Sequence, residues 1–185
     1  MSLLLTGGLL VDGTGQAPAR ADVLVRDGRI ARIDGAGATQ DAGVASDDGV
    51  EVRDVSGSIV CPGFVDIHTH SDLTVLAGPA ARSKVHQGVT TELVGNCGLG
   101  VAPLPAGADV AGIRSAVSYL DLDPALRWSW PDTAGYLDAV TAERPSLNVA
   151  TLTGHLPLRA GVVGFADRAP TTAELRIMKD LLATS

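Results

Sequence analysis

From residue 58 onward, strand-like runs alternate with helix-like runs, and this order restricts the fold more than any other feature of the sequence. Residues 59–70 and the β-branched run 89–94 predict strands, with a short helix at 80–88 between them. After an irregular stretch, a helix is predicted from Asp132 and a third strand at 148–153. Strands that alternate with helices favour a parallel sheet, so we expect an α/β fold.

The segment 1–56 predicts short strands separated by glycine turns. Val23–Arg26 and Arg29–Ile33 flank Asp27-Gly28, a dipeptide that favours a tight hairpin turn. We therefore expect two domains, a small β domain at 1–56 and an α/β domain at 57–185. Further strands are expected at 3–5, 9–11 and 51–55, and an exposed loop is expected at 35–49.

Charge and cysteine content exclude several classes of protein. The chain has 185 residues, a formal net charge of −7 and no cluster of basic residues, so nucleic acid and anionic membrane are poor partners. Its two cysteines, Cys61 and Cys97, are too few for a disulfide-built secreted scaffold, so a cytoplasmic location is expected. Cys61, next to Pro62, is predicted to be buried filler. No apolar run reaches the roughly 18 residues that a membrane-spanning helix needs.

The segment Pro62–His70 carries the main chemical signal. If it is a strand, Asp66, His68 and His70 point to one face, with the two imidazoles about 7 Å apart. Neutral imidazole is a good ligand for zinc, and the end of a parallel strand is where α/β enzymes place their ligands. The alternative is a pair of polar residues on a half-exposed strand.

Cys97 follows the predicted strand 89–94. Because neighbouring parallel strands lie about 5 Å apart and end on one rim, its thiolate is expected to reach the same metal as the histidines. The alternative is that Cys97 is a small buried apolar residue, as single cysteines often are.

Other polar residues receive weaker assignments. His155 ends the third predicted strand and could line a pocket, and Arg159 suits a substrate carboxylate. We expect Asp66 to bond nearby backbone, and we take neither it nor Asp72, a predicted loop residue, as a general base. Pro157 is expected to stiffen a rim loop. Two further expectations are a solvent-facing His86 and a last helix that begins at Thr171 or Thr172 with Glu174 as its capping partner.

These motifs together resemble a known family. Pro62–His70, Gln87–Thr91 and the Gly95-Asn96-Cys97-Gly98 loop are similar to the amidohydrolase superfamily, and specifically to the D-aminoacylases. The resemblance implies a small N-terminal β-sandwich followed by the first strands and helices of a (β/α)8 TIM-type barrel. It also implies one or two divalent ions, zinc above all, with metal ligands His68, His70 and Cys97.

The implied activity is metal-dependent hydrolysis of an N-acyl-D-amino acid, a small molecule, to a carboxylate and the free D-amino acid. The family's remaining metal-binding histidines and its catalytic aspartate lie on later strands, so no catalytic residue is assigned within this chain. Residues after 56 leave room for roughly three or four βα units, whereas a whole barrel takes about 250 residues. The alternatives are a non-catalytic truncated fragment that self-associates through an incomplete barrel edge, or hydrolysis of a cyclic amide or another C–N bond.

Overall fold

A computed structural model describes residues 2–37, 49–120 and 123–185. These residues form two compact units, Met1–Pro62 and Gly63–Ser185. The first unit extends beyond residue 56 because the short strand Ile59–Val60 pairs with the first strand of the chain. Most of the loop predicted at 35–49 lies outside the described residues. In the described part of the chain, no helix combines the length and the apolar character that crossing a membrane requires.

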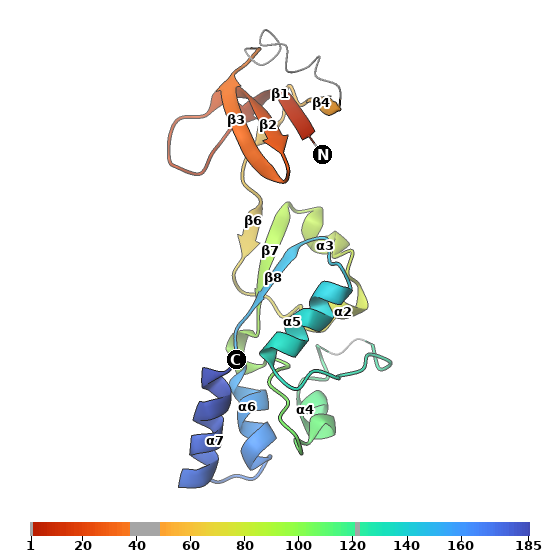
Figure 1. Ribbon diagram of the computed structural model, residues 1–185, viewed down its shortest axis with the longest axis vertical. Coiled ribbons are helices and arrows are strands. Elements are labelled where there is room, and N and C mark those ends of the chain that lie inside the picture. Colours follow the sequence, from red (N-terminus) through yellow and green to blue (C-terminus); the bar gives the residue numbers. More distant parts are fainter. Residues whose placement is uncertain (1, 38–48, 121–122) are drawn as a thin grey trace. The chain divides into compact units, whose positions relative to one another are not determined.

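The first unit is one mixed five-stranded sheet. Strands β3, β2, β1 and β4 are neighbours in that order (Figure 1). The short strand β5 also pairs with β1. The β1–β2 and β2–β3 pairs are antiparallel, whereas β4 and β5 run parallel to β1. The strands are β1 (Ser2–Leu10), β2 (Ala19–Arg26), β3 (Arg29–Gly35), β4 (Val50–Asp54) and β5 (Ile59–Val60).

The predicted hairpin is confirmed. Strands β2 and β3 pair in antiparallel register up to Arg26 and Arg29, which leaves Asp27 and Gly28 as the turn. Both turn residues have positive φ, 50° and 74°, as the tight hairpin turn with two left-handed residues requires. The hairpin therefore follows directly from this dipeptide.

The two strands predicted at 3–5 and 9–11 are one strand with an irregularity. The register of β1 against β2 shifts between Leu5 and Gly8, and Gly7 adopts a φ of 73°. The N–H of Gly7 donates to Oδ1 of Asp22, a buried carboxylate, at 3.0 Å. Because this bond satisfies the backbone group at the irregularity, the strand continues through it.

The second unit contains a three-stranded parallel sheet with the order β6-β7-β8, which confirms the expected α/β arrangement (Figure 1). The strands are β6 (Phe64–Asp66), β7 (Val89–Val94) and β8 (Asn148–Thr151). The helical elements are α2 (Thr74–Ala77), α3 (Arg82–Val85), η2 (Asn96–Gly98), α4 (Val110–Ala116), α5 (Thr133–Ala142), α6 (His155–Val163) and α7 (Thr172–Ala183).

The prediction of a single strand at 59–70 was wrong. Strand β5 ends at Val60 and β6 begins at Phe64, and the intervening Pro62 has no N–H to give a ladder. Strand β6 ends at Asp66, whose Oδ1 accepts the N–H of His68 at 3.2 Å. Both histidines therefore lie in the loop that follows the strand, and strand alternation does not place them.

The helix predictions are confirmed in part. Asp132 caps α5 by accepting the N–H of Gly135, and Thr171 forms a full capping box with Glu174 at the start of α7. The helix predicted at 80–88 is shorter than expected and occupies only α3. Helix α6 was not predicted. Pro157 lies in its first turn, where a missing N–H costs no hydrogen bond, and not in a loop.

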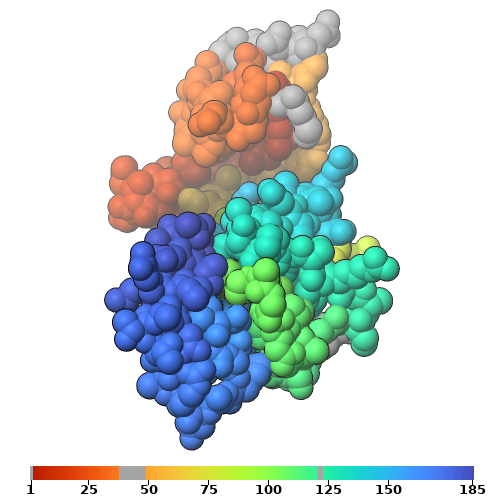
Figure 2. Space-filling model, turned by 60° about the horizontal axis from the view of Figure 1, so that its bottom comes forward, coloured from red at the N-terminus to blue at the C-terminus, as the bar shows by residue number. Residues whose placement is uncertain are grey.

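The core of the second unit lies between the sheet and the helices. The long connection after β7 contributes Val101, Ile113 and Val117, all of which are buried. Trp130 is buried as well and donates its indole N–H to the carbonyl of Val101 at 2.8 Å. Within this unit, the face shown in Figure 2 is formed by the segments around α4 (green), α5 (teal), α6 and α7 (blue). The stretch predicted as irregular is therefore a packed part of the core that supports the strand ends.

Candidate metal centre

His68 and His70 lie in the loop after β6, with their ring centroids 5.7 Å apart and their planes at 73°. The side chain of His68 is exposed and that of His70 is half-buried. The Nδ1 atom of His70 is itself buried and has no hydrogen-bond partner among the described residues. A buried ring nitrogen without a partner needs an explanation, and coordination of a metal ion supplies one.

Cys97 is carried to the histidines by the turn that ends β7. Gly95 has a φ of 79°, and a Cβ on it would lie 2.3 Å from the carbonyl oxygen of Leu152, so only glycine fits there. Cys97 follows in η2 with a φ of 56°. Its Sγ lies 3.4 Å from Nε2 of His68.

One ligand atom each from His68, His70 and Cys97 lies within 4.8 Å of the other two. Zinc bonds of about 2.0–2.3 Å place tetrahedral ligands about 3.5 Å apart. The Cys97–His68 distance of 3.4 Å already matches this spacing, and the distances to the third ligand atom are no greater than 4.8 Å. Two imidazoles and a thiol are also the donors that zinc prefers, so the residues present fit a zinc ion.

Buried polar bonds tie the two ligand-bearing segments together. Oδ1 of Asp72 accepts the N–H of Gly95 at 2.8 Å, and the side chain of Asn96 donates to the carbonyl of Thr69 at 3.3 Å. Tyr136 of α5 donates its hydroxyl to the carbonyl of Asp72 at 2.8 Å. Asp72 lies in a turn before α2, as the prediction of a loop residue implied, but it is buried, and burial raises the pKa of its carboxyl group.

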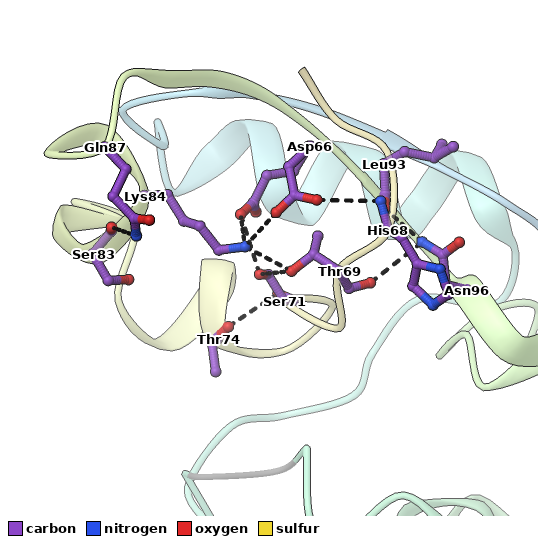
Figure 3. A network of polar contacts seen from close by, with 11 residues as sticks. Asp66, His68, Thr69, Ser71, Thr74, Ser83, Lys84, Gln87, Leu93 and Asn96 are labelled. Atoms are coloured by element: carbon purple, nitrogen blue, oxygen red, sulfur yellow. Dashed lines mark hydrogen bonds and ion pairs between the residues drawn. The ribbon is translucent and has the colours of Figure 1, made fainter. Parts of the chain in front are cut away.

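Figure 3 shows a second set of polar contacts next to the histidine loop, centred on Lys84 of α3. Its ammonium contacts Asp66 at 2.7 Å, Thr69 at 2.9 Å and the buried Glu92 of β7 at 3.0 Å. The ammonium holds the pKa of Asp66 below its usual range. Sequence reasoning predicted the backbone contact of Asp66 but missed Lys84 and Glu92. The available signal was one carboxylate in an otherwise uncharged strand.

His155 and Arg159 lie in α6 and line a cavity of about 180 Å³ together with Cys97. The guanidinium of Arg159 donates to three backbone carbonyls, those of Gly164, Ala166 and Arg168, at 2.7–2.9 Å. Arg159 therefore clamps the connection between α6 and α7. A substrate-binding role for either residue stays a prediction.

Two other sequence expectations concern exposed residues. Cys61 is exposed, so its prediction as buried filler was wrong. It follows the end of the two-residue strand β5, which is too short to bury it. His86, just after α3, is exposed as expected.

Residues 51–182 match the model of the amidohydrolase family. The chain belongs to this family. Among the curated relatives of this chain are two proteins of Alcaligenes xylosoxydans xylosoxydans. A D-aminoacylase is 40% identical over 97% of this chain and 34% of its own length. An N-acyl-D-glutamate deacylase is 37% identical over 99% of this chain and 34% of its own length.

Solved structures agree with this assignment. An N-acyl-D-glutamate deacylase from Bordetella bronchiseptica, complexed with zinc and a phosphonate inhibitor, is 40% identical with a TM-score of 0.79 over 98% of this chain. A D-aminoacylase structure is 35% identical with a TM-score of 0.78 over 97% of the chain. Each match covers 35% of the solved chain. The chain thus spans about a third of the length of the relatives it matches.

Proposed function

We propose that this amidohydrolase holds one or two zinc ions through His68, His70 and Cys97 and contributes them to hydrolysis of an N-acyl-D-amino acid. The observation that carries the proposal is the convergence of three ligand atoms within 4.8 Å at the ends of two parallel strands. Relatives that are named as D-aminoacylase and N-acyl-D-glutamate deacylase support the substrate class. A solved D-aminoacylase described as having a binuclear metal centre supports one or two ions.

The likeness to the solved D-aminoacylases, together with the order of the strands, supports a more detailed proposal for the fold. We propose that β6, β7 and β8 are the first three strands of a (β/α)8 barrel, since all three run parallel in sequence order. The sheet of the first unit is then part of a β-sandwich. Cytoplasmic location is proposed as well, because exposed free thiols at Cys61 and Cys97 suit a reducing compartment.

The residues of the site have separable roles in this proposal. The two imidazoles bind in their neutral form and Cys97 binds as the thiolate, so binding releases protons. When bound, the ion polarises the amide carbonyl and brings the pKa of water toward 7. Asp66 holds the backbone of His68, and Asp72 holds the turn that presents Cys97. We assign the role of general base to none of the described residues.

Metal content tests the proposed centre. We expect one or two equivalents of zinc in the purified protein, and loss of most of it in His68→Ala and Cys97→Ala. The matched controls are His86→Ala and Cys61→Ala, which alter exposed residues of the same types outside the three-ligand cluster. Unchanged zinc in both ligand variants would reject the centre.

Turnover tests the substrate class separately. Release of free amine from N-acyl-D-amino acids, and not from their L enantiomers, is the expected result in protein that contains zinc. Hydrolysis only of cyclic amides or of other C–N bonds would keep the metal centre and replace the substrate.

A non-catalytic role through self-association has its own supporting observation. Strand β6 is an edge strand of its sheet, and Phe64 and Val65 on it are both 58% exposed. Exposed edge strands with apolar side chains pair with other chains. If this role is correct, light scattering will show oligomers and no amide will be hydrolysed. Turnover by a monomer would exclude it.

A further inference from the structure

Lys84 contacts both of the chain segments that carry the metal ligands. Its ammonium touches Asp66 and Thr69 in the histidine segment and Glu92 in β7, the strand that leads to Cys97. We propose that Lys84 is a positioning residue of the metal centre, which sets the separation between the histidine loop and the cysteine turn. The proposal rests on the proposed zinc-binding function of His68, His70 and Cys97.

The first step is the link from Lys84 to the histidines. Oδ2 of Asp66 receives the ammonium at 2.7 Å, while Oδ1 of the same carboxylate accepts the N–H of His68 at 3.2 Å. Lys84 therefore fixes the carboxylate that fixes the backbone of a ligand. Thr69, between the two histidines, accepts a further bond from the ammonium at 2.9 Å. Figure 3 shows these side chains converging on the amine.

The second step is the link from Lys84 to the cysteine strand. Glu92 is only 1% exposed, and its Oε1 lies 3.0 Å from the ammonium. The same oxygen accepts the hydroxyl of Ser71 at 3.3 Å, so the carboxylate of β7 also contacts the histidine loop directly. Strand β7 then runs two residues beyond Glu92 to the turn that presents Cys97.

The negative charges of Asp66 and Glu92 explain why a cation is needed between the histidine loop and β7. Asp66 and Glu92 are two carboxylates that share a single ammonium, and the Glu92 side chain has almost no access to water. Without Lys84 they repel each other, and Glu92 is left as a buried unpaired charge. The two segments then move apart, and the ligand atoms with them.

A purely structural role makes a different prediction. If Lys84 only neutralises Glu92, a variant that lacks both charges should fold and bind zinc as well as the wild-type protein does. If Lys84 positions the ligands, removal of both charges restores folding but leaves the Asp66 carboxylate without the cation that orients it. The double variant Lys84→Met/Glu92→Gln separates these roles, because it leaves no buried unpaired charge to prevent folding.

The test is competitive zinc titration of the whole chain against a chromophoric chelator. Loss of an interaction that orients a metal ligand weakens metal binding about 10–100-fold, and we expect this in Lys84→Met/Glu92→Gln. The Glu92→Gln single variant keeps the Lys84–Asp66 pair and is expected to lose less. Lys84→Arg is expected to stay within a few-fold of wild type, because a cavity of about 230 Å³ beside Lys84 gives room for the larger guanidinium.

Cobalt supplies a second readout that a structural role does not move. In the double variant we expect a weaker thiolate-to-cobalt absorption band, since Cys97 is no longer held at bonding distance. Unchanged zinc affinity and an unchanged band in a cooperatively melting double variant would overturn the positioning role. Wild-type protein that binds no zinc would overturn the proposed function, and the positioning role with it. Zinc binding that is normal in wild type and equal in all variants overturns the positioning role alone.

Discussion

Gly95 donates its backbone N–H to Oδ1 of Asp72, 23 residues earlier in the chain, over 2.8 Å. Asp72 follows His70 by two residues, and Gly95 precedes Cys97 by two. Both bonded groups are buried. Together with the bond from Asn96 to the carbonyl of Thr69, this hydrogen bond joins the loop of the histidines to the turn of the cysteine, independently of the contacts of Lys84.

Replacement of Asp72 by alanine is expected to lower the free energy of unfolding by about 1–3 kcal/mol, because the buried N–H of Gly95 loses its acceptor. Asp72→Asn keeps an oxygen at this position and is expected to cost less. Urea unfolding followed by the fluorescence of the buried Trp130 measures both values. Equal losses in the two variants would show that the hydrogen bond does not determine the effect.

A methyl group at Gly95 tests the turn itself. Gly95→Ala combines a positive φ of 79° with a Cβ 2.3 Å from the carbonyl oxygen of Leu152, so we expect a loss of about 2–4 kcal/mol. The control is Gly107→Ala, with a φ of 85° and open space around its Cβ, for which about 1 kcal/mol is expected. Similar losses would mean that the contact with Leu152 relaxes freely.

Thiol alkylation distinguishes the two exposed cysteines. Zinc is expected to slow modification of Cys97 at least tenfold, since a coordinated sulfur is not available to the reagent. Cys61 lies in the other unit and outside the ligand cluster, so its rate should not change. Mass spectrometry of the two peptides with and without zinc gives the rates. Equal protection of both thiols would indicate a general effect of zinc on the protein.

The cap of α7 predicts a pH dependence. Hydrogen bonds from Arg168, and from the backbone and hydroxyl of Thr171, lower the pKa of Glu174 to about 2. Since the folded-state pKa is below the usual value near 4.5, the stabilisation is full above that value and is lost as the pH falls toward 2. Glu174→Gln should therefore lower the melting temperature near pH 7 and leave it unchanged near pH 2.

The contribution of the Thr171 hydroxyl to the same helix cap can be tested separately. Thr171→Ala removes the oxygen that accepts the N–H of Glu174 and is expected to cost about 1 kcal/mol. Circular dichroism during thermal unfolding measures this loss. No change in stability would mean that the first turn of α7 frays without consequence.

Local chemistry explains which parts of the fold could be predicted. Asp27-Gly28, Asp132 and Thr171 each determine a turn or a helix start through their own neighbours, and all three predictions are confirmed. The strand predicted at 59–70 failed because Pro62 interrupts pairing and Asp66 bonds the backbone of His68. The alternation of apolar and polar residues does not reveal either effect, because each depends on the hydrogen bonds of particular residues.

The candidate site shows the same division. His68, His70 and Cys97 could be identified from residue type and motif, and the structure brings their ligand atoms together. The contacts around them could not be predicted, because Lys84 and Glu92 meet only when α3 packs against β7. Which segments pack together depends on the tertiary fold, and a single sequence does not state it.

The left-handed backbone of Cys97, with a φ of 56°, limits how this centre could diverge. Apart from glycine, asparagine and aspartate tolerate that conformation best, whereas β-branched residues do not. Aspartate is the one of these that still offers an anionic ligand, but it exchanges a soft sulfur for a hard oxygen. The least costly substitution at this position would therefore shift metal preference from zinc toward manganese or magnesium while leaving the chain trace intact.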